Sequence, residues 1–180
     1  ITIVDENGAA RPVGESGDIY VRNLMGSDFE YHNEPEKTEA VHLKPGVFTF
    51  GDVGYFDEDG YLYLSDRKID MIISGGFNIW PAELENVLLN HPEVLEVAVY
   101  AIPDARWGET PAATCVVEAG AGVTALDLIA LCAKTLGSYK KPTQIYFQTD
   151  ALPKSPVGKV QRKVLREPHW QGQDRRVSGN

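Results

Sequence analysis

Residues 65–85 read SDRKIDMIISGGFNIWPAELE, and this stretch separates two different hydrophobic patterns. A charged cluster at 66–70 is followed by a short apolar run at 71–73 and then by a glycine pair at 75–76. Pro81 is well suited to a first helical position, and the apolar residues after it recur on one helical face. We interpret this stretch as a hinge between two structural units.

The chain before the hinge has the pattern of a β-rich unit. Alternating and aromatic-rich segments predict strands at 1–4, 18–22, 47–50, 53–56 and 61–64. The last two are expected to form a hairpin, and Gly51-Asp52 is expected to close the strand before them. One short helix is predicted at 35–41, with Asn33 as its cap. This unit, residues 1–68, is too short for a convincing complete core, so we expect it to be part of a larger domain.

The pattern after the hinge is α+β. Helices are predicted from Pro81, at 124–136 and at 160–166, and strands at 94–102, 112–117 and 143–148. Thr124 and Asp127 form a capping-box pattern, and Gly137 is expected to end that helix. We predict a small domain at 69–167, followed by a flexible tail at 168–180.

Charge is unevenly distributed in this chain of 180 residues and net charge −9. Residues 1–65 contain 13 acidic and 4 basic residues, a net charge of −9, whereas residues 134–166 contain 8 basic residues and 1 acidic residue, a net charge of +7. The basic region indicates a surface that meets an anion, but no nucleic-acid recognition motif accompanies it.

Two features of the sequence bear on the cellular compartment. Cys115 and Cys132 are too few for a disulfide framework, which favours a reducing compartment. No signal-peptide pattern opens the chain, and no apolar run approaches the ~20 residues that span a bilayer. We therefore expect a cytoplasmic protein with no transmembrane segment.

One acidic and one basic side chain close to the hinge, Asp52 and Arg67, are candidates for binding a nucleotide. Asp52 could accept two hydrogen bonds from a vicinal diol such as that of ribose, although a simple Asx-turn would also explain it. Arg67 offers a rigid fork that suits phosphate or ribose oxygens. A surface ion pair with Asp66 or Asp70 is the alternative.

Two loops carry further candidates. Gly75 and Gly76 allow backbone conformations closed to other residues, which a close ligand or a plain turn would equally require. Lys159 lies in a loop rich in Pro and Gly, from which a long cation could stabilise developing negative charge. A solvated lysine in a basic region is the alternative. The four histidines show no metal-ligand spacing, so no metal site is expected in the chain.

Three segments together are more specific than any of them alone. FTFGDVGY at 48–55, DRKIDMIISGGFNIWPAELE at 66–85 and PKSPVGK at 153–159 resemble three ordered motifs of the adenylate-forming superfamily of acyl/aryl-CoA synthetases and luciferase-like enzymes. The closest resemblance is to acyl-CoA synthetases, also called fatty-acid–CoA ligases, and it extends over residues 1–167. It implies the small C-terminal α+β domain of these enzymes, with short sheets flanked by helices, preceded by a β-rich part of the large domain.

The resemblance implies a reaction in two steps, with ATP, Mg²⁺ and coenzyme A. A carboxylate attacks the α-phosphate of ATP to give acyl-AMP and pyrophosphate, and the thiol of coenzyme A then displaces AMP. Asp52 and Arg67 match residues that contact the ribose, and Asn78 matches one that contacts the adenylate. Lys159 matches the lysine that bridges carboxylate and phosphate oxygens during adenylation, where it offsets charge repulsion.

The second step is implied to use another face of the same domain. Gly75 and Gly76 match the loop that lines the pantetheine tunnel after the small domain has rotated at the pivot Lys68–Ile69. Ile69 departs from the Asp or Lys that many relatives carry there, so a polar latch at the pivot would be lost.

The glycine-rich ATP loop and the adenine motif of these enzymes are absent from the chain. The resemblance therefore implies the last third of an enzyme whose missing N-terminal domain is a partner, and the chain alone is expected to be inactive. Other expected partners are a small carboxylic acid, ATP and CoA, with a homodimer left open and the identity of the acid unspecified. Loading of a carrier protein and a noncatalytic nucleotide- or CoA-binding module remain alternatives.

Overall fold

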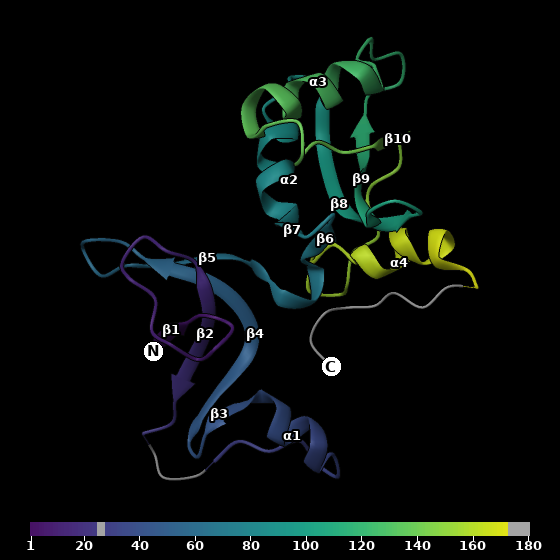
Figure 1. Ribbon diagram of the computed structural model, residues 1–180. Helices are drawn as coiled ribbons and strands as arrows, with labels where there is room; N and C mark the ends of the chain where they lie inside the picture. Colours follow the sequence, from purple (N-terminus) through teal and green to yellow (C-terminus); the bar gives the residue numbers. More distant parts are fainter. Residues whose placement is uncertain (25–27, 173–180) are drawn as a thin grey trace. The chain divides into compact units, whose positions relative to one another are not determined.

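A computed structural model describes residues 1–24 and 28–172, and Figure 1 shows its helices and strands. The chain divides into two compact units, Ile1–Ile69 and Asp70–Asn180. The division lies beside the pivot that the sequence indicates at Lys68–Ile69.

The N-terminal unit is an antiparallel sheet with one helix. Its strands are ordered β1-β2-β4-β3, and β5 pairs with β4. Its elements are β1 (Thr2–Val4), β2 (Gly17–Arg22), α1 (Pro35–Val41), β3 (His42–Lys44), β4 (Val47–Phe56) and β5 (Leu62–Arg67), and the 3₁₀ helix η1 (Lys68–Asp70) crosses from this unit into the next. The predicted β-rich character of this unit is confirmed.

One prediction for this unit is wrong, because β4 is a single strand rather than two. Thr49 pairs with Tyr20 and Val53 pairs with Asp18, so residues 50–52 of β4 face the one residue between those partners on β2. Gly51 adopts a φ of +79°, which lets the strand bulge and then continue. Gly51-Asp52 therefore lies at a bulge within β4 and does not close a strand.

The predicted cap of α1 is also wrong. The N-cap residue is Glu34, and no side chain caps the helix. Asn33 instead has a φ of +60°, a turn conformation that asparagine tolerates better than most residues. Pro35 begins the helix, and its missing N–H leaves one backbone donor fewer to satisfy.

The C-terminal unit packs helices against a mixed sheet. Its strands are ordered β10-β9-β6-β7 with β8 paired to β9, and only the β10–β9 pairing is parallel among those described. Its elements are β6 (Ile72–Ser74), β7 (Phe77–Ile79), α2 (Pro81–Leu89), β8 (Val94–Asp104), β9 (Gly108–Val117), α3 (Ala125–Leu136), β10 (Gln144–Gln148), α4 (Arg162–Arg166) and the 3₁₀ helix η2 (Glu167–Trp170). The α+β class is confirmed.

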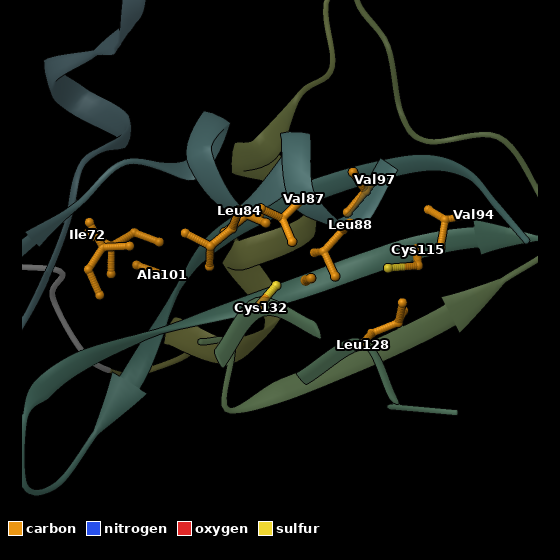
Figure 2. Packing of buried hydrophobic residues seen from close by; sticks show 13 residues of the cluster. Ile72, Leu84, Val87, Leu88, Val94, Val97, Ala101, Cys115, Leu128 and Cys132 are labelled. Atoms are coloured by element: carbon orange, nitrogen blue, oxygen red, sulfur yellow. The ribbon is translucent and has the colours of Figure 1, made fainter. Parts of the chain in front are cut away.

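Alternation along β8 gives this unit two apolar faces. Val97 and Val99 pack into the main core with α2 and α3, as Figure 2 shows for part of that cluster. Ala98 and Tyr100, between and beyond them, belong to smaller clusters on the other face, where Leu165 of α4 packs. Because successive side chains of a strand point to opposite faces, one strand serves both layers.

Two free cysteines, Cys115 and Cys132, lie in the main core. Burial raises the pKa of the Cys115 thiol to about 12 and that of Cys132 to about 11. Such thiols stay protonated at neutral pH and behave as small apolar side chains.

One predicted helix start differs from that in the structure, whereas the predicted ends of α3 hold. The Thr124–Asp127 capping box and the Gly137 end of α3 are confirmed. The predicted helix at 160–166 begins only at Arg162, because Val160 forms a β-bridge with Lys154.

The predicted flexible tail at 168–180 falls partly on ordered residues. Trp170 ends η2, and its Nε1 donates a hydrogen bond to the Ala101 carbonyl over 2.9 Å, so the start of this segment is held against β8. Residues 173–180 lie outside the described residues. Within residues 1–24 and 28–172, no helix has both the length and the apolar character needed to cross a membrane.

Candidate functional site

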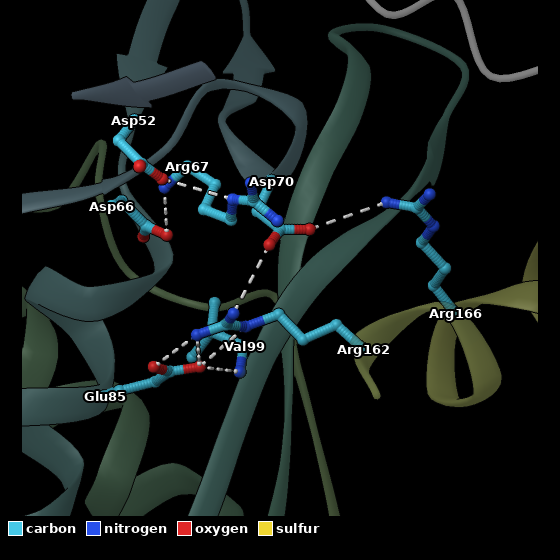
Figure 3. Close-up of polar contacts among 8 residues, drawn as sticks. All are labelled: Asp52, Asp66, Arg67, Asp70, Glu85, Val99, Arg162 and Arg166. Atoms are coloured by element: carbon cyan, nitrogen blue, oxygen red, sulfur yellow. Dashed lines mark hydrogen bonds and ion pairs between the residues drawn. The ribbon is translucent and has the colours of Figure 1, made fainter. Parts of the chain in front are cut away.

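The bulge in β4 brings Asp52 next to Arg67 of β5. The two residues pair directly across the β4–β5 ladder, and Arg67 Nε donates to Asp52 Oδ1 over 3.2 Å (Figure 3). Arg67 Nη2 also donates to the Phe50 carbonyl, over 3.1 Å. The side chains remain 38% exposed at Asp52 and 57% exposed at Arg67. The pair therefore presents a carboxylate acceptor and guanidinium donors to solvent at one place.

The contacts around these two residues show which partners they take. The amide of Gly51 donates to Thr49 Oγ1 over 3.0 Å, a turn that begins at Thr49 and precedes Asp52. Arg67 forms a surface ion pair with Asp52, and its amide donates to Asp66 Oδ1 over 2.8 Å. Asp70 instead pairs with Arg162 and Arg166. The predicted alternative of a surface ion pair therefore holds for Arg67, with Asp52 as the partner acid.

The proposed pivot residues follow directly after β5. Lys68 Nζ forms an ion pair with Asp18 Oδ2, within the N-terminal unit. The Ile69 side chain is 57% exposed, although apolar residues of its size are more often buried. The chain therefore leaves the N-terminal unit from an anchored lysine through a solvent-exposed isoleucine.

The glycine pair forms the turn of the β6–β7 hairpin. Ser74 pairs with Phe77, so Gly75 and Gly76 are the two turn residues, with φ values of +58° and +85°. Two successive positive φ values are typical of the type I′ turn, which matches the twist of a hairpin. A Cβ at Gly75 would lie 2.6 Å from Trp107 Cε3, whereas no atom lies within 4 Å of one at Gly76. Gly75 is therefore required for a close contact as well as for its backbone conformation.

A small pocket of about 210 Å³ opens beside this turn. The rings of Phe77 and Tyr139 are in contact, with their centroids 5.0 Å apart, and both residues line the pocket. Its other lining residues include Gly75, Trp107 and Lys141. The sequence analysis did not single out the aromatic residues. Trp107 directly precedes a glycine in the sequence, but its 45% exposure beside the pocket is visible only in the structure.

Lys159 and Asn78 are exposed in the C-terminal unit. The amide of Ser155 donates to the Lys159 carbonyl over 2.8 Å, and the amide of Lys159 donates to Ser155 Oγ over 3.2 Å. A β-bridge between Lys154 and Val160 closes the loop at its base. The backbone at Lys159 is thus fixed, while its charged side chain reaches solvent. Asn78 lies in β7 opposite Ile73.

A charged cluster at the start of α4 is a further feature that the sequence analysis missed. Arg162 contacts Glu85 and Asp70, which are distant in the sequence (Figure 3). Only the excess of basic residues in 134–166 pointed to this region, and it did not indicate which acids they meet.

Comparison with known proteins finds a family model and relatives that are similar to this chain. Residues 83–159 match the model of the AMP-binding enzyme C-terminal domain. The chain is 40% identical over 169 residues to the long-chain-fatty-acid–CoA ligase FadD13 of Mycobacterium tuberculosis, covering 94% of this chain and 33% of that protein. It is 38% identical over 176 residues to the fatty acid–[acyl-carrier-protein] ligase ScoC of Streptomyces coeruleorubidus, covering 98% of this chain and 33% of that protein.

A solved structure is similar to this chain over a part of its own length. The crystal structure of ATP-bound MatB from Rhodopseudomonas palustris superposes with a TM-score of 0.83 at 35% identity, covering 93% of this chain and 33% of that one. The chain thus spans about a third of the length of the relatives that it matches. Residues 83–159 belong to the AMP-binding enzyme C-terminal domain family, and the C-terminal unit has the small α+β fold of that domain in adenylate-forming enzymes.

Proposed function

We propose that this chain acts as the C-terminal part of an ATP-dependent acyl-CoA synthetase. In the first step a carboxylate oxygen of the acid attacks the α-phosphorus of ATP, and the bond to pyrophosphate breaks to give acyl-AMP. In the second step the sulfur of CoA attacks the acyl carbon, AMP leaves, and the thiol proton passes to solvent or base. The exposed Asp52–Arg67 pair is the observation that carries this proposal, since it suits a nucleotide ribose.

Asp52 and Arg67 would hold the two ribose hydroxyls. An ionised carboxylate accepts hydrogen bonds from both hydroxyls of a vicinal diol, and the guanidinium adds a donor of fixed geometry. Arg67 spans Asp52 and the Phe50 carbonyl, so it is already oriented before a ligand arrives. Preorganisation of this kind lowers the entropy lost on binding. Asn78 would contact the adenylate from the C-terminal unit.

Lys159 would act in the first step only. The acid and the phosphates of ATP are both anionic, so their approach is opposed by charge repulsion that a positioned cation offsets. The exposed side chain of Lys159 on a backbone-fixed loop suits this role, which requires no proton transfer. Rotation at Lys68–Ile69 would then withdraw Lys159.

Gly75 and Gly76 would act in the second step. The open space around Gly76 leaves the turn free to approach a ligand closely, and the pocket beside Gly75 would accept the thiol-bearing arm of CoA. This assignment accounts for a hairpin turn without side chains at an exposed edge of the domain.

Mg²⁺ is expected to enter together with ATP. Within residues 1–24 and 28–172, no three His, Cys, Asp or Glu side chains are grouped so that they could hold a metal ion. No step above is assigned to the ion.

A carrier protein in place of CoA is the second candidate acceptor. The similarity to ScoC, named a fatty acid–[acyl-carrier-protein] ligase, extends over 98% of this chain and favours it as an alternative. Both acceptors present a thiol to the same acyl-AMP, so the first step is common to the two.

The test uses the full-length protein that contains this chain. It should catalyse acid-dependent exchange of pyrophosphate into ATP, and thioester formation should require either CoA or a carrier protein. Asp52→Ala should raise the KM for ATP by roughly 10- to 100-fold, because it removes hydrogen bonds to a charged acceptor. Glu58→Ala is the matched control, since Glu58 is an exposed acid in the turn between β4 and β5. An unchanged KM in Asp52→Ala, or an equal rise in both variants, would remove Asp52 from the ribose site.

A further inference from the structure

Arg162, the first residue of α4, joins three segments of the C-terminal unit. Its Nη2 donates to Glu85 Oε2 over 2.8 Å and to Oε1 over 2.9 Å, and its Nε also donates to Oε1 over 3.1 Å. Its Nη1 donates to Asp70 Oδ2 over 3.4 Å. Figure 3 shows the guanidinium between these two carboxylates. The planar fork of arginine satisfies both acids at once, which a lysine could not do with the same geometry.

The acids that receive Arg162 are themselves fixed. Glu85 comes from α2, and its Oε1 also accepts the Val99 amide of β8 over 2.8 Å. Asp70 ends η1 and also lies 3.9 Å from Arg166 Nη1, on the next turn of α4. Side-chain exposures are 15% for Glu85, 18% for Asp70 and 21% for Arg162. Removing one member of such a partly buried ion pair strongly lowers the stability of the folded protein, because the remaining charge stays desolvated without its partner.

Two members of this cluster lie close in the sequence to segments that the proposed function uses, the Lys159 loop and the pivot. Arg162 follows Lys159 by three residues, and the Gln161 amide between them donates to the Pro153 carbonyl over 2.8 Å at the base of the loop. Asp70 is the first residue of the C-terminal unit and follows Ile69 directly. The side chains of Arg162 and Asp70 therefore connect the Lys159 loop with the segment where the chain leaves the pivot.

We propose that Arg162 is a positioning residue for adenylation, which sets the Lys159 loop relative to Asp70 through the Glu85–Arg162–Asp70 contacts. The inference rests on the proposed function, since it assumes that Lys159 acts in the first step. In this role Arg162 acts through the Lys159 loop and not on the reacting atoms. Because Arg162 follows the loop directly and is joined to Asp70 by a charged hydrogen bond, a rotation at the pivot moves the loop and Asp70 as one body, and Lys159 arrives in a fixed place.

The first test needs no enzymatic activity and uses the 180-residue chain. Amide hydrogen exchange is measured for Arg162→Gln and for the control Lys163→Gln, which changes the exposed neighbour on α4. We expect faster exchange at Gly158, Lys159 and Gln161 in Arg162→Gln, beyond any change at Ala113 in the β8–β9 ladder. A uniform rise that includes Ala113, or no change, would show that Arg162 does not hold the loop and would overturn the proposal.

The second test uses the full-length enzyme and separates the two half-reactions. Arg162→Gln should lower kcat for acid-dependent pyrophosphate exchange by about 100-fold, the loss typical of a misplaced catalytic group. Thioester formation from supplied acyl-AMP should stay close to wild type in Arg162→Gln. Arg162→Lys should retain more pyrophosphate exchange than Arg162→Gln. Equal loss of both half-reactions, or no loss of exchange, contradicts the positioning role.

A second variant keeps the proposal testable if Arg162→Gln folds poorly. Asp70→Asn preserves side-chain shape and leaves the Glu85–Arg162 pair intact, so only the connection to the pivot segment is weakened. Asp70→Asn should lower the rate of pyrophosphate exchange and leave amide hydrogen exchange in the Lys159 loop close to wild type. Full adenylation activity in this variant would overturn the proposed connection between the loop and the pivot segment. If the wild-type enzyme shows no pyrophosphate exchange, the proposed function fails, whereas the hydrogen-exchange result still decides whether Arg162 orders the loop.

Discussion

Gly75→Ala tests whether the β6–β7 turn is built against Trp107. Both turn glycines have positive φ, so an alanine at either position adopts a left-handed backbone. Only at Gly75 does the new Cβ also meet an atom, Trp107 Cε3 at 2.6 Å, with Cζ3 at 3.1 Å. Gly76→Ala is therefore a matched control that carries the backbone cost without the contact.

The expected losses of stability follow from two costs, the left-handed backbone at either glycine and the contact with Trp107 at Gly75. A left-handed conformation costs an alanine roughly 1–2 kcal/mol at either position. At Gly75, carbon atoms that prefer ~3.5–4.0 Å must also separate by about 1 Å, which adds about 1 kcal/mol because the half-exposed ring of Trp107 can shift. We expect Gly75→Ala to lower the free energy of unfolding by about 2–3 kcal/mol and Gly76→Ala by about 1–2 kcal/mol. The effect of alanine on the unfolded chain is the same in both and cancels.

Urea unfolding of the 180-residue chain, followed by tryptophan fluorescence, measures this difference. Trp107→Ala should abolish it, because the contact partner is then gone. In the full-length enzyme, Gly75→Ala should also slow thioester formation more than adenylation, since its methyl group crowds the pocket. Equal destabilisation by the two alanines, or a difference that survives Trp107→Ala, would refute the assigned contact.

Two further predictions concern titration and capping. The pKa of His42 is raised above its ordinary 6.5 by its hydrogen bond to the Thr38 carbonyl and next by Asp28, so its contribution to stability is complete below about pH 6.5 and is lost as the pH rises through the raised pKa. An NMR titration should show this raised pKa, and Asp28→Asn should move it back toward 6.5; an unmoved value would contradict the pairing. Thr124→Ala should destabilise the chain by about 0.5–2 kcal/mol in urea unfolding, because the α3 cap is lost. Thr135→Ala, within the same helix, should not, and equal effects would argue against the cap.

Features set by neighbouring residues were predictable from the sequence. The capping box of α3 and the helix that begins at Pro81 follow from contacts within one turn of a helix. The core face of α2 also follows, since Leu84, Val87 and Leu88 recur with helical spacing and are buried.

Features set by distant residues were not predictable in this way. The bulge that keeps β4 continuous depends on which residues of β2 pair with Thr49 and Val53, and this pairing leaves no local signal. Arg162 meets acids 77 and 92 positions away, so the local pattern around it shows only a basic helix. The Asp52–Arg67 contact joins residues 15 positions apart, and their proximity follows from the hairpin register.

Lys159 is proposed to serve adenylation and not thioester formation. The most direct measurement compares the two half-reactions of Lys159→Ala in the full-length enzyme, with Lys154→Ala as the control in the same loop. We expect loss of acid-dependent pyrophosphate exchange in Lys159→Ala, together with near wild-type thioester formation from supplied acyl-AMP. Equal loss of both half-reactions, or full retention of pyrophosphate exchange, would contradict the claim.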